Sequence, residues 1–315
     1  MTDQPGLLRE GFRRTWHYQR VVWFMFVISL VFGHFSAGAV RHKLDGVTEH
    51  SLQSQRLTGM FDYGTFSALA SNPEVKLFEV AGVSISFALV FFVIVLFLTG
   101  GILEAYRSGR KLTTREFFEA CGAYFWRWVR LVIMMMIVMI PPLMFTKVVF
   151  DKPPAMMFSA AQEKTAFWLM ISGLGAIGFV LMCIRLWFDM AQVRAVVEEE
   201  SAMWRNAGRA FKLTFTNFGS LFWLYLRVSI VGWIILGAGL YTWAKMPPGR
   251  SQLTFLVLEV VVLCGFGVRL WQRACEMIWY QRRFLAPMTL PVTLPAAPSP
   301  SPLLSIAPPP PESLG

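Results

Sequence analysis

Charged side chains inside long apolar runs are the residues of this sequence best suited to chemistry. Five such positions stand out: Arg185, Asp189, Arg227, Glu259 and Arg269. An ionisable group inside a membrane is costly, so it usually faces other helices, lines a substrate path or extends to the membrane surface. Arg185 and Asp189 are four residues apart and therefore share one face of a helix, where they can form an ion pair. The sequence thus predicts polar sites within the membrane.

Two interpretations of these groups stay open at this stage. The three arginines have side chains long enough to snorkel to the lipid headgroups, which would make them structural. Glu259 lies six residues into the sixth apolar run and has a short side chain. Either a polar contact between helices or a substrate or proton site fits it.

Patterns typical of catalysis, metal binding and nucleotide binding are missing. All four histidines lie in the first sixth of the chain, and the four cysteines form no CxxC motif or Cys/His cluster. The chain contains no GxSxG, HExxH or Walker-type motif. We therefore expect no catalytic residue, no metal and no cofactor, and the sequence favours a protein that is not an enzyme.

The composition indicates which elements must position the charges. Of 315 residues, 55% are hydrophobic and 15% are charged, and the mean hydropathy is +0.51. Soluble domains carry about 25% charged residues, so a soluble globular protein is excluded, and so is a disordered one. The net charge of +10 is spread among apolar segments. This distribution favours anionic membrane lipids as partners, and no nucleic acid.

Six apolar runs are long enough to cross a bilayer, which takes about 20 residues. We predict an all-α polytopic fold whose six transmembrane helices lie at residues 21–40, 80–103, 128–150, 167–188, 221–243 and 253–270. The segment 41–79 forms an outer loop. Pro141 and Pro142 in the third run remove backbone donors and should kink or end that helix.

The same runs divide the chain into three parts. Residues 1–20 form a lead with an interfacial helix, residues 21–285 form the membrane domain, and residues 286–315 form a Pro-rich tail that should be disordered. An alternative for the first run is a signal peptide, with Val21–Phe32 as its apolar region. Against it, the run reaches spanning length and its lead belongs to a repeat.

The positive charges predict the orientation. The flanks on the side of both termini hold 17 Lys and Arg, and the opposite flanks hold 9. Cytoplasmic loops carry the excess of positive charge, so both termini should be cytoplasmic. No Asn-x-Ser/Thr glycosylation signal occurs, which favours the cytoplasmic membrane of a bacterium.

An internal repeat precedes the odd-numbered spans. Three pairs of residues, each six positions apart, align without gaps: Phe12 with Tyr18, Phe118 with Tyr124, and Phe211 with Asn217. In these segments aromatic residues share one helical face and arginines another, as in amphipathic helices that lie in the membrane interface. We predict three pseudo-repeats, each an interfacial helix followed by two spans, with these six residues as interfacial anchors. A purely structural role, fixing the tilt of the spans, is also compatible with the pattern.

Two of the even-numbered spans also share a short sequence motif. Arg185-Leu186-Trp187 near the end of the fourth span matches Arg269-Leu270-Trp271 at the end of the sixth. Leu103-Glu104-Ala105 closes the second span without the arginine. The threefold relation is therefore degenerate at that position.

A weak family resemblance follows from these motifs. Residues 189–194 and 210–214, with Asn217-Phe218 and the matching Arg115-Glu116-Phe117-Phe118, resemble uncharacterised bacterial six-span integral membrane proteins. They are also loosely similar to the membrane region that precedes the catalytic domain of some glycerophosphodiester phosphodiesterases. The resemblance covers about residues 5–285 and does not include the phosphodiesterase barrel. It therefore implies no catalytic residue here.

The sequence favours a non-enzymatic accessory or scaffold protein in envelope or lipid homeostasis. Many interfacial anchors and little polar chemistry inside the membrane motivate this expectation. The alternative is a permease or permease subunit for a small solute or amphiphile, with a path near Glu259 and the inner arginines. Expected partners are anionic lipids, together with another membrane protein or a second copy of the chain.

Overall fold

The computed structural model describes residues 6–48, 77–157, 163–247 and 250–285, and every regular element in these ranges is a helix. In chain order they are α1 (Leu7–His17), α2 (Gln19–Thr48), α5 (Leu77–Ser108), α6 (Thr114–Met157), α7 (Glu163–Val197), α8 (Met203–Thr216), α9 (Phe218–Ala244) and α10 (Ser251–Tyr280), followed by the short π-helix η1 (Gln281–Leu285). The prediction of an all-α polytopic fold is confirmed.

Six of these helices, namely α2, α5, α6, α7, α9 and α10, are long and apolar enough to cross a membrane. The six predicted spans are therefore confirmed, and the chain is a multi-pass membrane protein. The helices extend beyond the predicted spans, because apolar runs mark only the part in hydrocarbon whereas backbone hydrogen bonding continues into polar sequence. Thus α2 continues to Thr48 and α5 begins at Leu77, so residues 41–48 and 77–79 of the predicted loop are helical instead. Residues 49–76 and the tail 286–315 lie outside the described residues.

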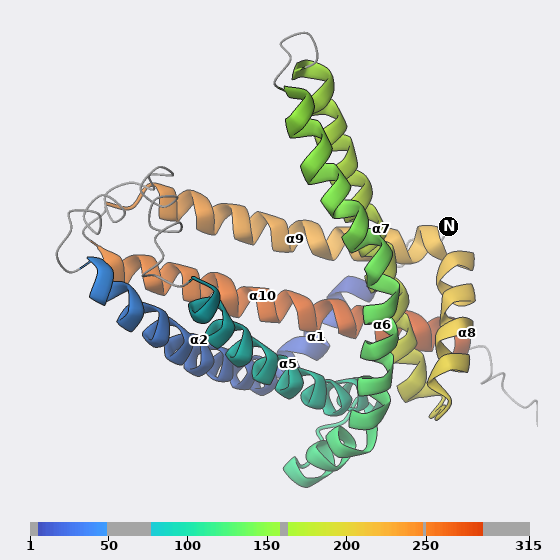
Figure 1. Ribbon diagram of the computed structural model, residues 1–315. Helices are drawn as coiled ribbons and strands as arrows, with labels where there is room; N and C mark the ends of the chain where they lie inside the picture. The colour runs from blue at the N-terminus through green and yellow to red at the C-terminus, as the bar shows by residue number, and fades with distance from the viewer. Residues whose placement is uncertain (1–5, 49–76, 158–162, 248–249, 286–315) are drawn as a thin grey trace, which may run out of the picture.

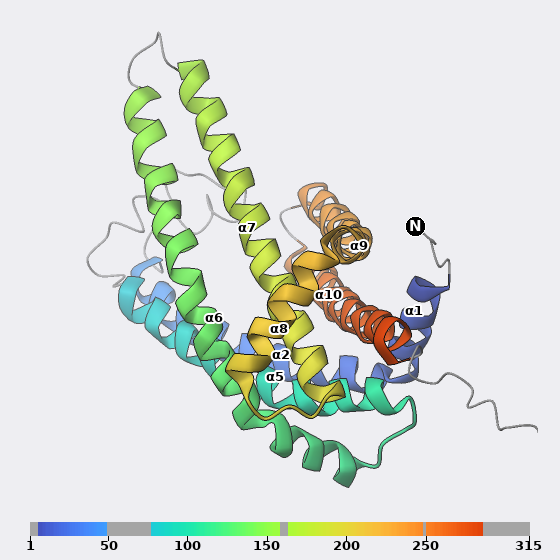
Figure 2. The same cartoon turned by 90° about the vertical axis from the view of Figure 1, so that its right-hand side faces the viewer.

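The spans form three hairpins, α2/α5, α6/α7 and α9/α10, which meet at one end. We call this end the base. It contains the first turns of α2, α6 and α9 and the last turns of α5, α7 and α10, and α1 and α8 pack against it (Figures 1 and 2). The largest fully buried side chains lie here, including Leu103, Trp128, Met190, Leu221 and Met277. The base is therefore the core of the molecule.

The outer parts of the hairpins differ from the base. In Figure 1, α2, α5, α9 and α10 run in one general direction, whereas α6 and α7 leave the base steeply as a separate pair. We call the outer parts of α6 and α7, residues 135–157 and 163–180, the arm. Figure 2 shows the arm from the side, again projecting beyond the other helices. Its large apolar side chains, such as Ile137, Met144 and Trp168, are exposed.

Two of the three predicted lead helices are separate elements. α1 ends at His17 and α8 ends at Thr216, and at the next residue, Tyr18 or Asn217, the backbone leaves the helical region before the following span begins. The third lead continues without a break into α6, so Tyr124 lies within that helix. Gly100 and Gly101 of α5 explain the difference. Any Cβ at these two positions would crowd α6, so the glycines let α6 lie directly along α5 from its first turns.

Pro141 and Pro142 do not end the third span, because α6 is helical from Thr114 to Met157. Proline removes only its own donor, and α6 is supported beyond the prolines by α7. A Cβ added at Gly173 of α7 would lie 2.8 Å from a methyl group of Val149, so the two helices touch at this glycine. This packing carries the helix past a site that would end it in isolation.

Candidate functional site

The short helices α1 and α8 dock onto spans through the same hydrogen bond. The indole nitrogen of Trp271 on α10 donates to the backbone oxygen of Leu8 at 2.9 Å, and that of Trp187 on α7 donates to Ala207 at 2.8 Å. Each tryptophan belongs to one of the matching Arg-Leu-Trp motifs. Each acceptor lies four residues before an aligned phenylalanine, Phe12 or Phe211. The Arg-Leu-Trp motifs and the aligned phenylalanine segments therefore contact each other in the structure.

The aligned phenylalanines complete these contacts. Phe12 packs edge to face on Trp271, with ring centroids 5.7 Å apart, and Phe211 packs edge to face on Trp187 at 5.0 Å. Edge-to-face pairs at this spacing are a favourable arrangement of aromatic rings. In the third aligned segment Phe118 instead stacks on Phe97 of α5, at 6.3 Å. The aromatic contact of the second aligned segment therefore differs from those of α1 and α8.

The buried faces of α1 and α8 are also equivalent. Gly11 and Thr15 on α1 are buried, as are Ala210 and Thr214 at the same positions relative to the phenylalanine on α8. A Cβ at Gly11 would overlap the sulfur of Cys275 on α10. Small side chains at these positions let both helices approach their spans closely.

The large aromatic residues of these helices are exposed, although Phe12 and Phe211 also contact a tryptophan of the neighbouring span. Phe12 and Trp16 on α1 are 51% and 64% exposed, and Trp204 and Phe211 on α8 are 74% and 45% exposed. Phe118 at the start of α6 is also exposed. The aromatic faces are thus available to lipid, while the small residues contact the spans.

The second residue of each predicted anchor pair is hydrogen-bonded to the protein. The Tyr18 hydroxyl donates to the carbonyl of Ala105 at 3.1 Å, and the hydroxyl of the buried Tyr124 approaches Glu104 at 3.4 Å. The Asn217 amide donates to the carbonyl of Leu213 at 3.0 Å, at the end of α8. These three side chains contact protein groups.

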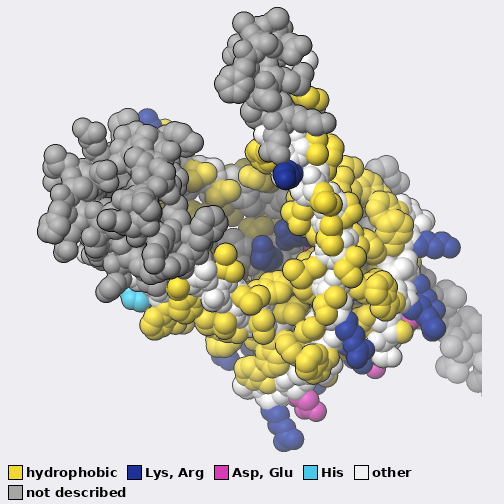
Figure 3. Space-filling model, viewed as in Figure 1, with side chains coloured by type: hydrophobic (Ala, Val, Ile, Leu, Met, Phe, Trp, Pro, Cys, Tyr) yellow, Lys and Arg dark blue, Asp and Glu magenta, His cyan; other side chains and the backbone are white. Residues whose placement is uncertain are grey.

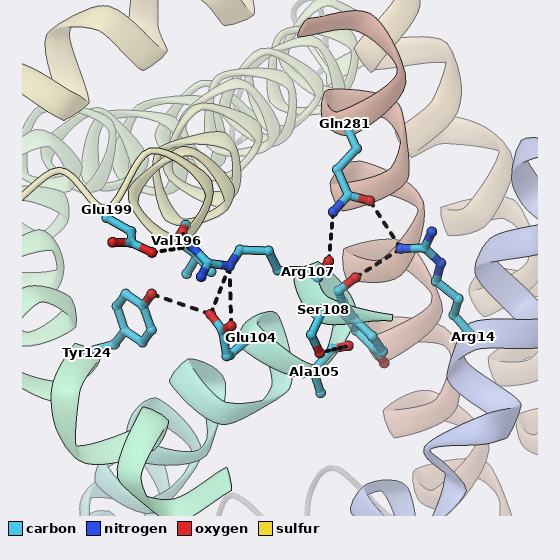
Figure 4. A network of polar contacts seen from close by, with 10 residues as sticks. Arg14, Glu104, Ala105, Arg107, Ser108, Tyr124, Val196, Glu199 and Gln281 are labelled. Carbon is cyan, nitrogen blue, oxygen red and sulfur yellow. Dashed lines mark hydrogen bonds and ion pairs between the residues drawn. The ribbon is translucent and has the colours of Figure 1, made fainter. Parts of the chain in front are cut away.

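A polar network ties the base together around the last turn of α5 (Figure 4). Arg14 of α1 donates to the carbonyl of Tyr106 at 2.9 Å, and Gln281 donates to the carbonyl of Arg107 at 3.1 Å. Arg14 also donates to the Gln281 side-chain oxygen at 3.2 Å. The last carbonyls of a helix lack partners within it, so α1 and η1 supply them here.

Arg107 extends this network to α7. Its guanidinium donates to the carbonyl of Val196 at 2.8 Å and to Glu199 at 2.7 Å, and it pairs with Glu104 at 3.2 Å. The guanidinium of Arg107 holds the pKa of the Glu199 carboxyl below its ordinary value. The sequence reasoning counted Arg107 only as a flanking charge, because nothing in the spacing shows which carbonyls it reaches.

Other arginines of the base are paired as well. Arg194 binds Glu198 with two donors, at 2.9 and 2.6 Å, and holds the pKa of that carboxyl below its ordinary value. Arg110 pairs with Glu116 at 2.9 Å, and Arg209 pairs with Glu200 at 3.2 Å. The charges at the base are therefore largely internal ion pairs.

A cavity of about 420 Å³ opens at the base between α5, the start of α6 and the α7–α8 connection. Its charged lining includes Arg107, Arg110, Arg127, Glu104 and Glu116. Most of these groups already pair with one another. Among the described residues, no group of three or more His, Cys, Asp and Glu side chains could hold a metal ion.

Three of the five charges predicted within the membrane come together near the base. Arg185 and Asp189 of α7 form the expected ion pair, with 3.7 Å between Nε and Oδ2. The Arg185 guanidinium lies over the ring of Tyr225 on α9, 5.6 Å from its centroid. Arg269 of α10 lies within electrostatic range of both Arg185 and Asp189. We call these residues, with those of the next paragraph, the inner arginine cluster.

Sequence reasoning missed three members of this cluster, Gln272, Arg273 and Glu276. The Glu276 side chain is 2% exposed and accepts a hydrogen bond from Gln272 at 3.0 Å. Its second oxygen has no hydrogen-bond partner among the described residues. Gln272 and Glu276 follow Arg269 by three and seven residues, so the helical spacing places all three on one face. The predicted span ended at residue 270, which hid this signal.

The structure places the other two predicted charges elsewhere. The Arg227 guanidinium of α9 lies over the ring of Trp223, 5.2 Å from its centroid. Glu259 lies in the outer half of α10, half-buried, and makes no hydrogen bond or ion pair with the described residues. Neither joins the inner arginine cluster.

The arginines of this cluster are much less paired than those of the base. Within the described part of the chain, neither Arg269 nor Arg273 makes a hydrogen bond or an ion pair. The Arg185 side chain is 46% exposed, whereas its partner Asp189 is 13% exposed. Figure 3 shows a hollow between the arm and the other helices, with Lys or Arg side chains at its back. The cluster therefore presents guanidinium groups and keeps its carboxylates behind them.

No protein-family model, curated protein or solved structure matches this chain. The comparisons thus give no support to the similarity with the membrane region of glycerophosphodiester phosphodiesterases. The six-span membrane architecture stands on the structure itself.

Proposed function

We propose that this protein is a non-enzymatic accessory or scaffold component in envelope or lipid homeostasis. Its site is the cytoplasmic membrane of a bacterium, with both termini on the cytoplasmic side. The observation that best supports the proposal is the matching dock of α1 and α8 at the base. These helices present aromatic rings outward at the end of the molecule where Lys and Arg are concentrated.

The geometry of α8 is that of an interfacial helix. In Figure 1 it runs across the direction of α9 and α10, so it lies in the plane of a membrane that those helices cross. Its exposed residues combine Trp204 and Phe211 with Arg205, Arg209 and Lys212. Rings of this kind sink into the acyl boundary while cations remain among the headgroups. Each Lys or Arg near an anionic surface contributes about 1 kcal/mol.

We further propose that the chain consists of three pseudo-repeats, each an amphipathic segment with two spans. The matching contacts of α1 with α10 and of α8 with α7 support such a repeat. The second copy departs from it, because its amphipathic segment continues without a break into α6. In the described part of the chain, the exposed aromatic rings of α1 and α8 favour a binding role. A membrane-protein partner or a second copy of the chain fits such a role.

Spin-label accessibility in vesicles tests the interfacial placement. Labels at Trp16→Cys and His17→Cys compare two exposed positions on different faces of α1, after Cys183 and Cys264 are replaced by alanine; Cys121 and Cys275 are buried and stay. We expect the label at 16 to be protected from a water-soluble nickel complex and accessible to oxygen, and the label at 17 to show the reverse. Equal access of the nickel complex to both would contradict the proposal. Trp204→Cys and Arg205→Cys repeat the test on α8.

A lipid analysis tests the role itself. Deleting the protein should change the lipid composition of the producing cell, and the wild-type chain should restore it. We expect a variant with serine at Phe12 and Trp16 to be inserted and yet fail to restore the composition, because α1 then loses its lipid-facing rings. Restoration by this variant would show that the aromatic face of α1 is not needed.

A second candidate function is a permease or permease subunit. The hollow beside the arm, with cations at its back, supports this alternative (Figure 3). It predicts flux of an anionic solute or amphiphile in proteoliposomes. Flux that depends on Arg269 would replace the scaffold proposal.

A further inference from the structure

We infer that Arg185, Arg269 and Arg273 bind the phosphate of an anionic phospholipid in the leaflet that surrounds the base. This inference rests on the proposed function, because it takes α1 and α8 to mark the membrane interface. It goes further by naming the ligand and the residues that hold it.

The level of the arginines is the first argument. Trp187 and Trp271 contact the two interfacial helices directly, so they mark the depth of the headgroup boundary. Arg185 and Arg269 precede these tryptophans by two residues, which is about 3 Å along a helix axis. Their long side chains therefore reach the depth at which lipid phosphates lie.

Arg185 and Arg269 have guanidinium donors without a close acceptor among the described residues. Arg107 and Arg194 at the base bind carboxylates or carbonyls at 2.6–3.2 Å. By contrast, the closest carboxylate contact of Arg185 is 3.7 Å, and Arg269 has no hydrogen bond or ion pair with the described residues. A guanidinium has five N–H donors and binds phosphate in a bidentate manner. An arginine in a span that has no acceptor among the described residues is well placed to bind an external anion.

Charge is the third argument. The three guanidinium groups outnumber the two carboxyl groups of Asp189 and Glu276, so the cluster keeps an excess of at least one positive charge whether or not both acids are ionised. A phosphodiester carries one negative charge and would neutralise it. Both acids are less exposed than Arg185, so they hold the arginines from behind and leave the front free.

The surroundings favour a lipid over a soluble anion. Tyr225 lies beneath Arg185, and Phe179 of α7 contacts both Phe218 and Phe222 of α9. Exposed apolar side chains continue along α7, α9 and α10 beyond the cluster. This surface suits acyl chains attached to the bound phosphate. Basic pockets between spans on the cytoplasmic side are known sites for anionic headgroups.

Lipid binding to the purified full chain tests the inference. Native mass spectrometry would compare phosphatidylglycerol with phosphatidylcholine for the wild type and for Arg269→Gln. The matched control is Arg227→Gln, which removes the same charge from another span outside the cluster. We expect Arg269→Gln to weaken phosphatidylglycerol binding by about tenfold. Phosphatidylcholine binding should be unchanged, and the control should remain close to the wild type.

Other results would overturn the inference. Equal losses in Arg269→Gln and Arg227→Gln would indicate general electrostatics, and no loss in Arg269→Gln would exclude the site. Displacement of phosphatidylglycerol by millimolar inorganic phosphate would indicate a site for a soluble anion. If Arg269→Gln fails to fold, Arg269→Lys replaces it, since a point charge lacks the bidentate fork and should bind more weakly. The spin-label test on α1 does not depend on phospholipid binding by the arginines. Failure of one proposal can therefore be distinguished from failure of the other.

Discussion

At the base, Trp128, Leu103 and Met190 are at most 1% exposed, whereas Met144 and Trp168 on the arm are 69% and 59% exposed. Both regions carry large apolar side chains. The base buries its side chains in protein and adds side-chain hydrogen bonds to helix ends, and the arm leaves its side chains to lipid. Stability of the isolated chain should therefore reside in the base, while the position of the arm depends on what surrounds it.

The largest expected effect is a cavity at the base. Trp128→Ala should lower the free energy of unfolding by about 3–5 kcal/mol, because it empties a fully packed site. The matched change on the arm is Trp168→Ala, which should cost little because its ring is mostly exposed. Denaturant unfolding in detergent micelles measures both. Similar losses for the two variants would refute the contrast between base and arm.

A smaller effect is expected where α1 contacts α10. Gly11→Val should destabilise by about 1–3 kcal/mol, because even a Cβ overlaps Cys275 and α1 must move. Gly208→Val is the control, since this glycine of α8 has no neighbour within 4 Å of an added Cβ. Hydrogen exchange should rise across α1 in the first variant only. Unchanged exchange in α1 would mean that the dock does not depend on close approach.

The ion pair of Arg194 with Glu198 predicts a pH dependence of the base. Because the folded pKa of Glu198 lies below its ordinary value, the pair stabilises the protein above that value and the contribution is lost as the pH falls. With Tyr280 also bound to Glu198, we expect about 1 kcal/mol or less, since the pair is partly exposed. Glu198→Gln should remove this part of the acid sensitivity. Identical unfolding curves of wild type and variant between pH 6 and about pH 4 would contradict the assignment.

The smallest effect is expected on the arm. Ile137→Ala should change the unfolding free energy by about 0.5 kcal/mol or less, as for exposed positions in general. The change should stay small at every protein concentration. A loss that is large at high protein concentration and shrinks as the protein is diluted would show that the arm is covered by a second copy of the chain, and the comparison would then hold only for the monomer.

The inner arginine cluster shows how far sequence reasoning could reach. The pairing of Arg185 with Asp189 follows from helical spacing, and the structure confirms it. Glu276 was missed because the last helix continues well past its apolar run. Arg227 and Glu259 satisfied the same sequence criterion as Arg269, and the structure places the Arg227 guanidinium over Trp223 and Glu259 in the outer half of α10. One-dimensional hydropathy finds charges in spans but does not show which helices face each other.

The sequence by itself determined the six spans and the all-α fold, since both depend on local hydropathy along one chain. Only the tertiary structure decided that α6 has no break at Tyr124, that its helix continues past Pro141, and that the arm leaves the base. It also decided which arginines find partners. These features depend on contacts between different helices. A glycine on one helix allows its neighbour to pack closely, and a carbonyl at the end of one helix accepts a hydrogen bond from an arginine of another.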